Sequence, residues 1–400
     1  MKLAYFVFPH AGGTYSVFRN LRNGLLPFGI DLRWMGVGGA ARKAAESPEW
    51  ASERDLGFAV GHDRQSDVDM AQEVIHLLEQ EEFSGVFVNV LGGRVETNVM
   101  RYLPERLLKI MVVHTITPAT YAAARSIREH VHATICVSPR IQADLTGRHG
   151  FDERWTITIP NGVDLSRGGL SESQREERGP DIIFLGRIDD SSKGVFWLPE
   201  ILRQLPEEIR LTVAGDGPDL PRLRRKCADL GERVTFLGAV PAARVGTLLS
   251  EHGIFLMPSR YEGYPVALIE AMAAGCVPVA SQIKGVTSAI VTHGEDGLLF
   301  PIGDRHRAAL SIRELSDYPE RLASMSRRAR AKAHAAFNLA VMSDAYRDLL
   351  RRLSRDPPRT ATPLPIQHWS MAGGLEPSLR SYLPVPVKNF LRLTKERFIA

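Results

Sequence analysis

The sequence has few cysteines and no long apolar run, and each shortage excludes a class of protein. Its 400 residues contain three cysteines, Cys136, Cys227 and Cys276, each within an apolar segment. Because this number is odd and the spacing wide, a disulfide framework or zinc site is excluded and buried thiols in a reducing compartment are expected. No apolar run approaches the roughly 20 residues of a transmembrane helix, and the run at 1–8 is short for a signal peptide. We therefore expect a cytoplasmic protein.

The composition predicts a folded protein with its positive charge near the C-terminus. Hydrophobic residues make up 44% and charged residues 24% of the chain, so a wholly disordered chain is excluded. A length of 400 residues predicts two domains, at about 100–200 residues each. Residues 305–400 hold 18 Lys and Arg against 8 Asp and Glu, although the whole chain carries a net charge of only +4. This distribution argues against nucleic acid as a partner of the main body and for a basic surface on the tail.

The first part of the chain alternates between strand-like and helical patterns. Short apolar runs occur at 3–8, 30–37, 85–91, 109–114, 133–137 and 155–159. The helical pattern at 68–82 is typical of the segments between them. This alternation predicts a parallel sheet covered on both faces, in which ligands bind beyond the carboxyl ends of the strands. Residues at that predicted edge are His10, Gly92-Gly93, His114 and Ser138.

A second alternating unit follows a polar segment. We assign residues 1–165 to an N-terminal Rossmann-like domain and 166–180 to a linker. Residues 181–335 form the predicted second Rossmann-like domain, and we expect 336–400 to form C-terminal helices and a basic tail that cross back to the first domain. The predicted fold is α/β, with two doubly wound domains facing across a cleft.

The stretch at 258–272 carries the densest chemical signal. It reads Pro-Ser-Arg-Tyr-Glu-Gly-Tyr-Pro-Val-Ala-Leu-Ile-Glu-Ala-Met, which predicts a loop that leads into a helix. Pro265 suits the first helical position, and the exposed backbone amides at the start of the helix would attract phosphate. Glu262 and Glu270 can each accept hydrogen bonds from sugar hydroxyls. The stretch predicts a clamp for a sugar phosphate; the alternative is a core helix with two solvated glutamates.

The tail offers a second, weaker pattern. Within 386–398, Val387, Phe390, Leu391 and Phe398 share one helical face, and Lys388, Arg392 and Lys395 line the adjacent face. Such a helix can lie on an anionic membrane surface. The alternative is a helix that packs on the protein's own domains.

Four motifs of the second unit occur in a characteristic order: Gly186-Arg187-Ile188 with Lys193-Gly194, Gly215-Asp216-Gly217-Pro218, Glu262 through Glu270, and Glu295-Asp296-Gly297-Leu298. Together they resemble the retaining nucleotide-sugar glycosyltransferases of family 4, which have the two-domain GT-B fold. The resemblance is strong over 181–300, moderate over 1–165 and slight beyond 355. Asp67-Val68-Asp69 is similar to the metal motif of the other glycosyltransferase fold, but it opens a predicted helix, so we interpret it as a helix start.

The resemblance implies that the domain at 1–165 lies on the acceptor side and that the domain at 181–335 binds the nucleotide sugar. It also implies a role for each matching residue. Arg187 and Lys193 would bind the donor diphosphate, Glu262 and His114 the donor sugar, and Glu270 the ribose. Backbone lining of the donor would come from Gly12, Gly13, Gly215, Gly263, Tyr264, Pro265 and Val266. The two cations and the helix start would neutralise the leaving diphosphate, so the resemblance implies neither a metal nor another cofactor.

The mechanism and the donor sugar stay open at this point. In the family, the acceptor is usually described as attacking from the leaving-group face; a double displacement with Glu262 as nucleophile is the alternative. Gly285-Val286-Thr287-Ser288 stands where the family often has Gly-Gly-x-Pro-Glu, and Gln282 stands where Asp is common. These departures leave the identity of the sugar undetermined.

We thus expect a metal-independent, retaining glycosyltransferase that moves a hexose from a UDP- or GDP-sugar to a glycan or lipid-linked acceptor in polysaccharide or glycoconjugate biosynthesis. We expect it in the cytoplasm, with peripheral membrane contact through the basic tail. The alternatives are another GT-B reaction, such as that of a phosphorylase or an epimerase, and a non-catalytic subunit that binds nucleotide sugars. The nucleotide, the acceptor and the oligomeric state are not specified by the sequence.

Overall fold

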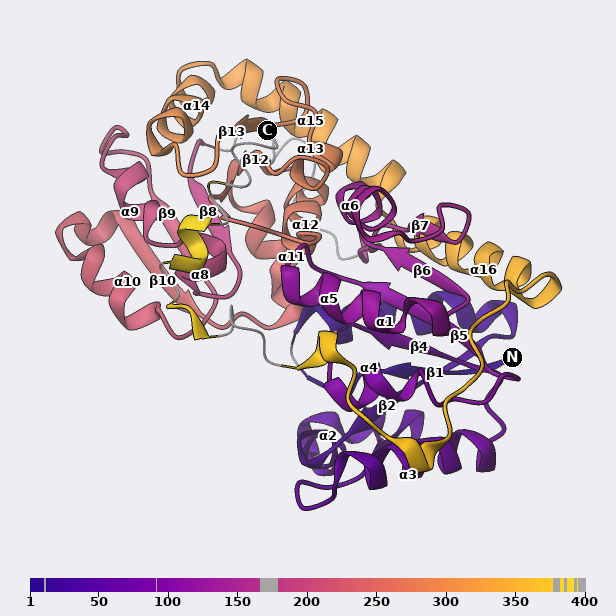
Figure 1. Cartoon of the computed structure of the whole chain (residues 1–400). Coiled ribbons are helices and arrows are strands. Elements are labelled where there is room, and N and C mark those ends of the chain that lie inside the picture. Colours follow the sequence, from indigo (N-terminus) through magenta and orange to yellow (C-terminus); the bar gives the residue numbers. More distant parts are fainter. Residues whose placement is uncertain are drawn as a thin grey trace. The chain divides into compact units, whose positions relative to one another are not determined.

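A computed structural model describes residues 1–10, 12–90, 92–165, 179–376, 382–384, 387–391 and 394. The chain divides into two compact units, 1–162 with 339–377, and 163–338 with 378–400 (Figure 1). Most of the predicted linker at 166–180 lies outside the described residues. The long helix at Leu339–Arg355 and the segment that follows it thus belong to the first unit, together with the N-terminal part of the chain.

The first unit contains a seven-stranded parallel sheet in the order β3-β2-β1-β4-β5-β6-β7. Its strands are β1 (Lys2–Phe6), β2 (Asp31–Val37), β3 (Gly57–Val60), β4 (Gly85–Asn89), β5 (Leu108–Val113), β6 (Ala133–Cys136) and β7 (Thr156–Thr158). Its α-helices are α1 (Gly13–Leu25), α2 (Gly39–Glu46), α3 (Asp67–Gln80), α4 (Arg94–Val99), α5 (Pro118–Ile127), α6 (Pro139–His149) and α16 (Leu339–Arg355). Central strands such as β4 are buried along their whole length, which explains their continuous apolar runs.

Helices α1 and α16 approach closely within the first unit. A Cβ added at Gly24 of α1 would lie 1.9 Å from the Ser343 Oγ of α16. The ring of Tyr346 on α16 lies 5.9 Å from that of Phe87 on β4, so α16 also contacts the core of this sheet. Glycine permits such an approach because it has no side chain that would separate the two helices. The predicted helix start at Asp67 is correct, since α3 begins there and the Ser66 side chain caps it.

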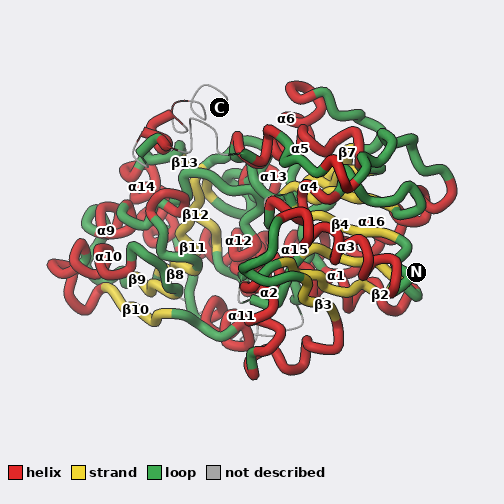
Figure 2. Tube along the Cα trace, turned by 60° about the horizontal axis from the view of Figure 1, so that its bottom comes forward, coloured by secondary structure: helices red, strands yellow, loops and turns green. Residues whose placement is uncertain are grey.

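The second unit contains a six-stranded parallel sheet in the order β10-β9-β8-β11-β12-β13 (Figure 2). Its strands are β8 (Ile182–Leu185), β9 (Leu211–Ala214), β10 (Val234–Gly238), β11 (Ile254–Met257), β12 (Val277–Ser281) and β13 (Leu298–Phe300). Its α-helices are α8 (Asp190–Lys193), α9 (Trp197–Leu202), α10 (Leu220–Lys226), α11 (Ala242–Ser250), α12 (Val266–Ala274), α13 (Thr287–Ile290), α14 (Arg305–Asp317) and α15 (Pro319–Ala336).

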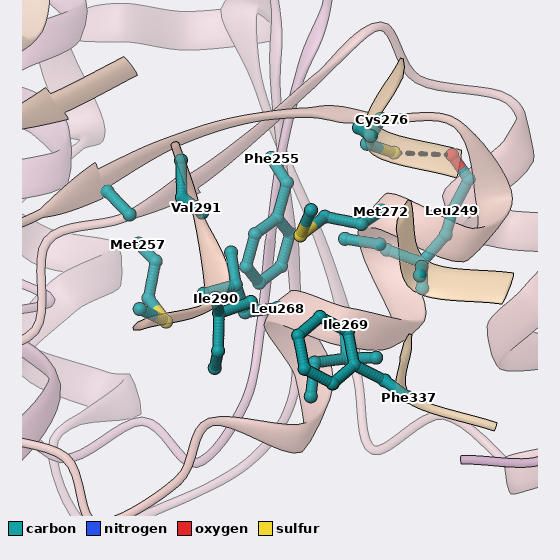
Figure 3. Packing of buried hydrophobic residues seen from close by; sticks show 14 of the residues in the cluster. Leu249, Phe255, Met257, Leu268, Ile269, Met272, Cys276, Ile290, Val291 and Phe337 are labelled. Atoms are coloured by element: carbon teal, nitrogen blue, oxygen red, sulfur yellow. Dashed lines mark hydrogen bonds between the residues drawn. The ribbon is translucent and has the colours of Figure 1, made fainter. Parts of the chain in front are cut away.

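The core of the second unit forms around α12. Phe255 of β11 packs with Leu268, Ile269 and Met272 of α12, all of them buried (Figure 3). The Cys276 thiol donates a hydrogen bond of 2.9 Å to the Leu249 carbonyl of α11 (Figure 3). All three cysteines are free and buried, as the sequence predicts. This packing fixes α12, whose N-terminal end carries the predicted sugar-phosphate stretch.

Of the helices that the structure describes, none combines the length and the apolar character needed to cross a membrane. The tail is described only in part: Phe390 is 68% exposed, and Val387 and Leu391 are also exposed. The cationic residues Arg392 and Lys395, and Phe398 of the predicted apolar face, lie outside the described residues.

Candidate functional site

The second unit brings Lys193 and Glu262 into direct contact. Lys193 Nζ lies 2.6 Å from Glu262 Oε1, and the Ser259 hydroxyl donates a 2.6 Å hydrogen bond to the same oxygen. Glu262 is only 8% exposed. A buried carboxylate requires a cation or hydrogen-bond donors; here Lys193 supplies the cation, and Ser259 supplies a further donor. The two predicted site residues, 69 positions apart, therefore form one cluster.

The loop after β8 carries the second predicted cation. Arg187 is exposed and follows Gly186 directly. Although burial raises the pKa of Asp189, hydrogen bonds from Ser191 and Ser192, together with the Arg187 charge, hold it below its ordinary value. The Asp189 side chain accepts a hydrogen bond of 2.9 Å from Ser191 N, which caps α8. The loop is therefore ordered by an ionised cap, with Arg187 at its start and Lys193 at its end.

Glycines let the loop after β9 approach the loop after β8. Gly215 has a φ of +139°, and a Cβ there would lie 1.9 Å from the Gly186 carbonyl oxygen. A Cβ at Gly217 would lie 2.4 Å from the Ile188 carbonyl oxygen. No other residue type fits such positions. The predicted importance of Gly215 thus has a structural cause, the close contact of two strand ends at the carboxyl edge of the sheet.

Helix α12 begins one residue later than the sequence suggested. Pro265 is the N-cap, with extended backbone angles (φ −82°, ψ 91°), and Val266 is the first helical residue, so the prediction that Pro265 occupies the first helical position is wrong. Proline lacks an N–H, which costs nothing at either position. The helix has no side-chain cap and no acidic residue in its first turn. Its N-terminal amides are thus not satisfied by a local side chain, as anion binding requires.

The predicted donor-binding residues around α12 differ in how deeply they are buried. Glu270 lies within α12 and is half-buried, and Gly263 is buried. The Tyr264 ring packs against the core of the second unit, and its hydroxyl is buried with no hydrogen-bond partner among the described residues. Burial raises the pKa of Tyr264 well above its ordinary value. Tyr264 can therefore line a ligand site through its backbone, while its side chain anchors the loop.

In the first unit, His10 organises the Gly12-Gly13 turn. Gly12 N donates a 2.8 Å hydrogen bond to His10 Nδ1, and His10 Nε2 lies 3.0 Å from Thr14 Oγ1. Because Nδ1 accepts, the neutral ring carries its proton on Nε2 and donates it to Thr14. Burial lowers the pKa of His10, which favours this neutral form. A Cβ at Gly12 would lie 2.6 Å from the His10 ring, so glycine is required there, whereas Gly13, the first residue of α1, has open space around it.

His114 has a defined tautomer. Its Nε2 lies 2.8 Å from Asn89 Oδ1, and Asn89 Nδ2 donates a 3.0 Å hydrogen bond to the Phe6 carbonyl oxygen. A carbonyl can only accept, so the Asn89 amide is fixed with Oδ1 toward the ring, and His114 must carry its proton on Nε2. Burial lowers the pKa of His114 to about 4. His114 is therefore uncharged near neutral pH, with a lone pair on Nδ1.

Sequence reasoning missed several residues that order these sites. In the first unit this residue is Asn89, which fixes the tautomer of His114. In the second unit they are Ser259 and Arg260. A signal for Asn89 was available, since it is a polar residue within the otherwise apolar run at 85–91; Ser259 and Arg260 stand inside the stretch at 258–272.

Solved structures with the same architecture identify the fold as GT-B. HepE of Anabaena, solved with UDP and glucose, is 17% identical and has a TM-score of 0.72 over 88% of this chain and all of that one. Sucrose-phosphate synthase of Thermosynechococcus elongatus is 19% identical, with a TM-score of 0.74 over 89% of this chain and 99% of that one. The chain thus has the GT-B fold, as the sequence predicts.

Sequence comparison shows that most of the second unit resembles known glycosyltransferases. Residues 179–317 match the model of the family described as glycosyl transferases group 1. A phosphatidyl-myo-inositol mannosyltransferase of Mycolicibacterium smegmatis is 28% identical over 186 residues, 44% of this chain and 47% of that protein. The putative colanic acid biosynthesis glycosyltransferase WcaL of Escherichia coli is 31% identical over 204 residues, 48% of this chain and 50% of that protein. The matched region thus spans half or less of these relatives, and over that region the predicted resemblance to family 4 is confirmed.

Proposed function

We propose that this chain is a retaining glycosyltransferase that moves a hexose from a nucleoside diphosphate sugar to a glycan or lipid-linked acceptor. The observation that carries the proposal is the contact between Lys193 and the buried Glu262 beside the N-terminal end of α12. Lys193 supplies a cation for the diphosphate, and Glu262 supplies acceptors for sugar hydroxyls. The two groups that a sugar diphosphate requires therefore stand side by side.

The charge distribution supports the diphosphate as the leaving group. Transfer of the hexose breaks its bond to the diphosphate, which then carries additional negative charge. Lys193, Arg187 and the uncapped N-terminus of α12 can stabilise this charge without a metal. Because these three groups can stabilise the charge, we propose that the reaction needs no divalent cation.

The contacts of Glu262 support attack from the leaving-group face. Its Oε1 already accepts hydrogen bonds from Lys193 and Ser259, which stabilise the carboxylate and weaken it as a nucleophile. In front-face transfer, the acceptor hydroxyl bonds to the anomeric carbon, the bond to the diphosphate breaks, and the departing phosphate oxygen takes the hydroxyl proton. A glycosyl adduct on Glu262, seen by mass spectrometry of wild type and absent in Glu262→Gln, would instead establish double displacement.

Donor hydrolysis tests the proposal without an identified acceptor. The purified chain is incubated with a panel of UDP- and GDP-sugars, with and without EDTA, and free UDP or GDP is measured. We expect slow release from one donor, unaffected by EDTA and lost in Glu270→Ala and Arg187→Ala. Arg203→Ala is the matched control, because Arg203 pairs with Asp229 at 2.7 Å on the surface of the same unit.

The other outcomes of that experiment are equally decisive. Thermal stabilisation by a donor without release, even with candidate acceptors present, would favour the binding subunit over the enzyme. Absorbance of a bound pyridoxal group would favour a phosphorylase. Neither release nor stabilisation with any donor would refute the proposed function.

The tail suggests where the acceptor is found. Exposed Val387, Phe390 and Leu391 accompany Lys388 and the excess of cations after 305. We propose peripheral contact with an anionic membrane, where a lipid-linked acceptor would be presented. Removal of 377–400 should abolish sedimentation with vesicles that contain anionic phospholipid and leave donor hydrolysis unchanged. Equal sedimentation of full-length and truncated chains would contradict this role.

A further inference from the structure

The helix that carries Lys193 is too short to hold its own position. Helix α8 consists of Asp190–Lys193, a single turn that ends at Gly194 in the left-handed conformation. Isolated helices shorter than about 12–15 residues are marginal in water. The place of the Lys193 side chain therefore depends on contacts from outside α8 in addition to the local Asp189 cap.

Arg260 makes three hydrogen bonds to this turn. Its Nη2 lies 2.8 Å from Asp190 Oδ2, its Nε donates to the Asp190 carbonyl at 2.8 Å, and its backbone N–H donates to the Ser192 carbonyl at 2.8 Å. The guanidinium also lies 3.8 Å from the centre of the Trp197 ring. The side chains of Arg260 and Asp190 are only 12% and 18% exposed, so water weakens these contacts less than it weakens a surface ion pair.

The segment that holds α8 is the same segment that presents Glu262. Arg260 precedes Glu262 by two residues, and both follow β11 directly. A Cβ at Gly194 would lie 2.3 Å from the Pro258 carbonyl oxygen, so the backbones of the two segments are in contact. One short segment thus contributes to the position of both partners of the Lys193–Glu262 pair, Glu262 by covalent linkage and Lys193 through Arg260; Asp219 also holds the start of α8, because Asp190 N donates a 2.8 Å hydrogen bond to its side chain.

We propose that Arg260 is a positioning residue that holds Lys193 where the donor diphosphate binds. The inference rests on the proposed function of this site, and it assigns Arg260 no contact with the donor. Because Arg260 acts through Lys193, its loss should weaken the binding of a nucleoside diphosphate only while Lys193 is present.

A double-mutant cycle tests this dependence. Dissociation constants for UDP and GDP are measured by calorimetry for wild type, Arg260→Ala, Lys193→Ala and the double variant. For the nucleotide that wild type binds, we expect Arg260→Ala to weaken binding about 10- to 100-fold, as the loss of a contact to a charged group does. In the Lys193→Ala background, the same substitution should weaken binding less than about threefold.

Two further variants serve as control and safeguard. Arg203→Ala removes another arginine–carboxylate pair of this unit and should leave the affinity unchanged. Should Arg260→Ala fail to fold, Arg260→Lys keeps the charge over Trp197 but loses the two-pronged contact with Asp190, and the same cycle applies with an intermediate effect.

The outcomes separate this inference from the proposed function. An equal loss of affinity in both backgrounds, or none in either, would overturn the positioning role while leaving the donor site intact. Binding of UDP or GDP with the expected coupling, but without turnover of any donor, would support the positioning role and overturn the catalytic proposal. If wild type binds neither nucleotide, both are overturned.

Discussion

Lowering the pH should destabilise the first unit through His114. Burial lowers the pKa of the folded ring to about 4, whereas an unfolded histidine titrates near ~6.5. As the pH falls below that value, the unfolded chain binds a proton and the folded chain does not. The contribution of His114 to the free energy of unfolding is therefore lost between about pH 6.5 and 4, and it is fully present above this range.

The two pKa values give the size of this effect. At pH 5 an unfolded histidine is almost fully protonated, whereas about one folded ring in ten is, for a pKa of about 4. The resulting loss in unfolding free energy between pH 8 and pH 5 is about 2 kcal/mol. This is a substantial share of the roughly 5–15 kcal/mol that stabilise a typical domain.

Urea unfolding at pH 8 and pH 5 measures the loss. His114→Gln removes the titrating ring, and its amide nitrogen can still donate to Asn89. We expect its pH-dependent loss to be about 2 kcal/mol smaller than that of wild type. Equal losses in wild type and His114→Gln would refute the reasoning.

His132 provides a matched control. Burial and the Lys109 charge lower its pKa to about 4 as well, but it lies at the amino end of β6, whereas His114 follows the carboxyl end of β5. In His132→Asn, the amide oxygen can replace Nδ1, which accepts from Lys109 N. The pH-dependent loss of unfolding free energy should be reduced in His132→Asn as much as in His114→Gln. Donor hydrolysis should be unchanged in His132→Asn and lowered in His114→Gln.

Three other substitutions test the sites. Lys193→Ala leaves the buried Glu262 charge without its cation and should cost about 2 kcal/mol of unfolding free energy in urea. Adding Glu262→Gln to Lys193→Ala should restore most of this loss; a double variant whose loss equals the sum of the two single losses would contradict the coupling. Gly215→Ala places a Cβ 1.9 Å from a carbonyl oxygen and should lower the melting temperature and abolish stabilisation by donor; an unchanged melting curve would contradict the packing. Asn89→Asp should raise the pKa of His114 by about 1–3 units, which an unaltered NMR titration of the ring would disprove.

The strands could be predicted well because parallel sheets bury whole strands. The apolar runs at 85–91 and 109–114 correspond to β4 at Gly85–Asn89 and β5 at Leu108–Val113. Their ends were less exact, since a strand ends where pairing with its neighbour ends, and the apolar run can continue beyond that point.

The start of α12 shows what local sequence leaves undetermined. A proline without an N–H is tolerated both at the N-cap and at the first helical position, so Pro265 alone cannot distinguish them. The structure assigns it to the N-cap. The inward packing of the Tyr264 ring likewise depends on the core beneath the loop, and no pattern within the stretch specifies that core.

The side-chain contacts follow from the order of the strands. In the second sheet β8 and β11 are neighbours, so the loops that leave their carboxyl ends, one ending at Lys193 and the other reaching Glu262, must run side by side. In the first sheet β4 pairs with both β1 and β5, which brings the Phe6 carbonyl, Asn89 and His114 together. Residues distant in sequence therefore meet because parallel strands end at the same edge. Strand runs alone do not give this order, because a run of apolar residues does not identify its neighbour in the sheet.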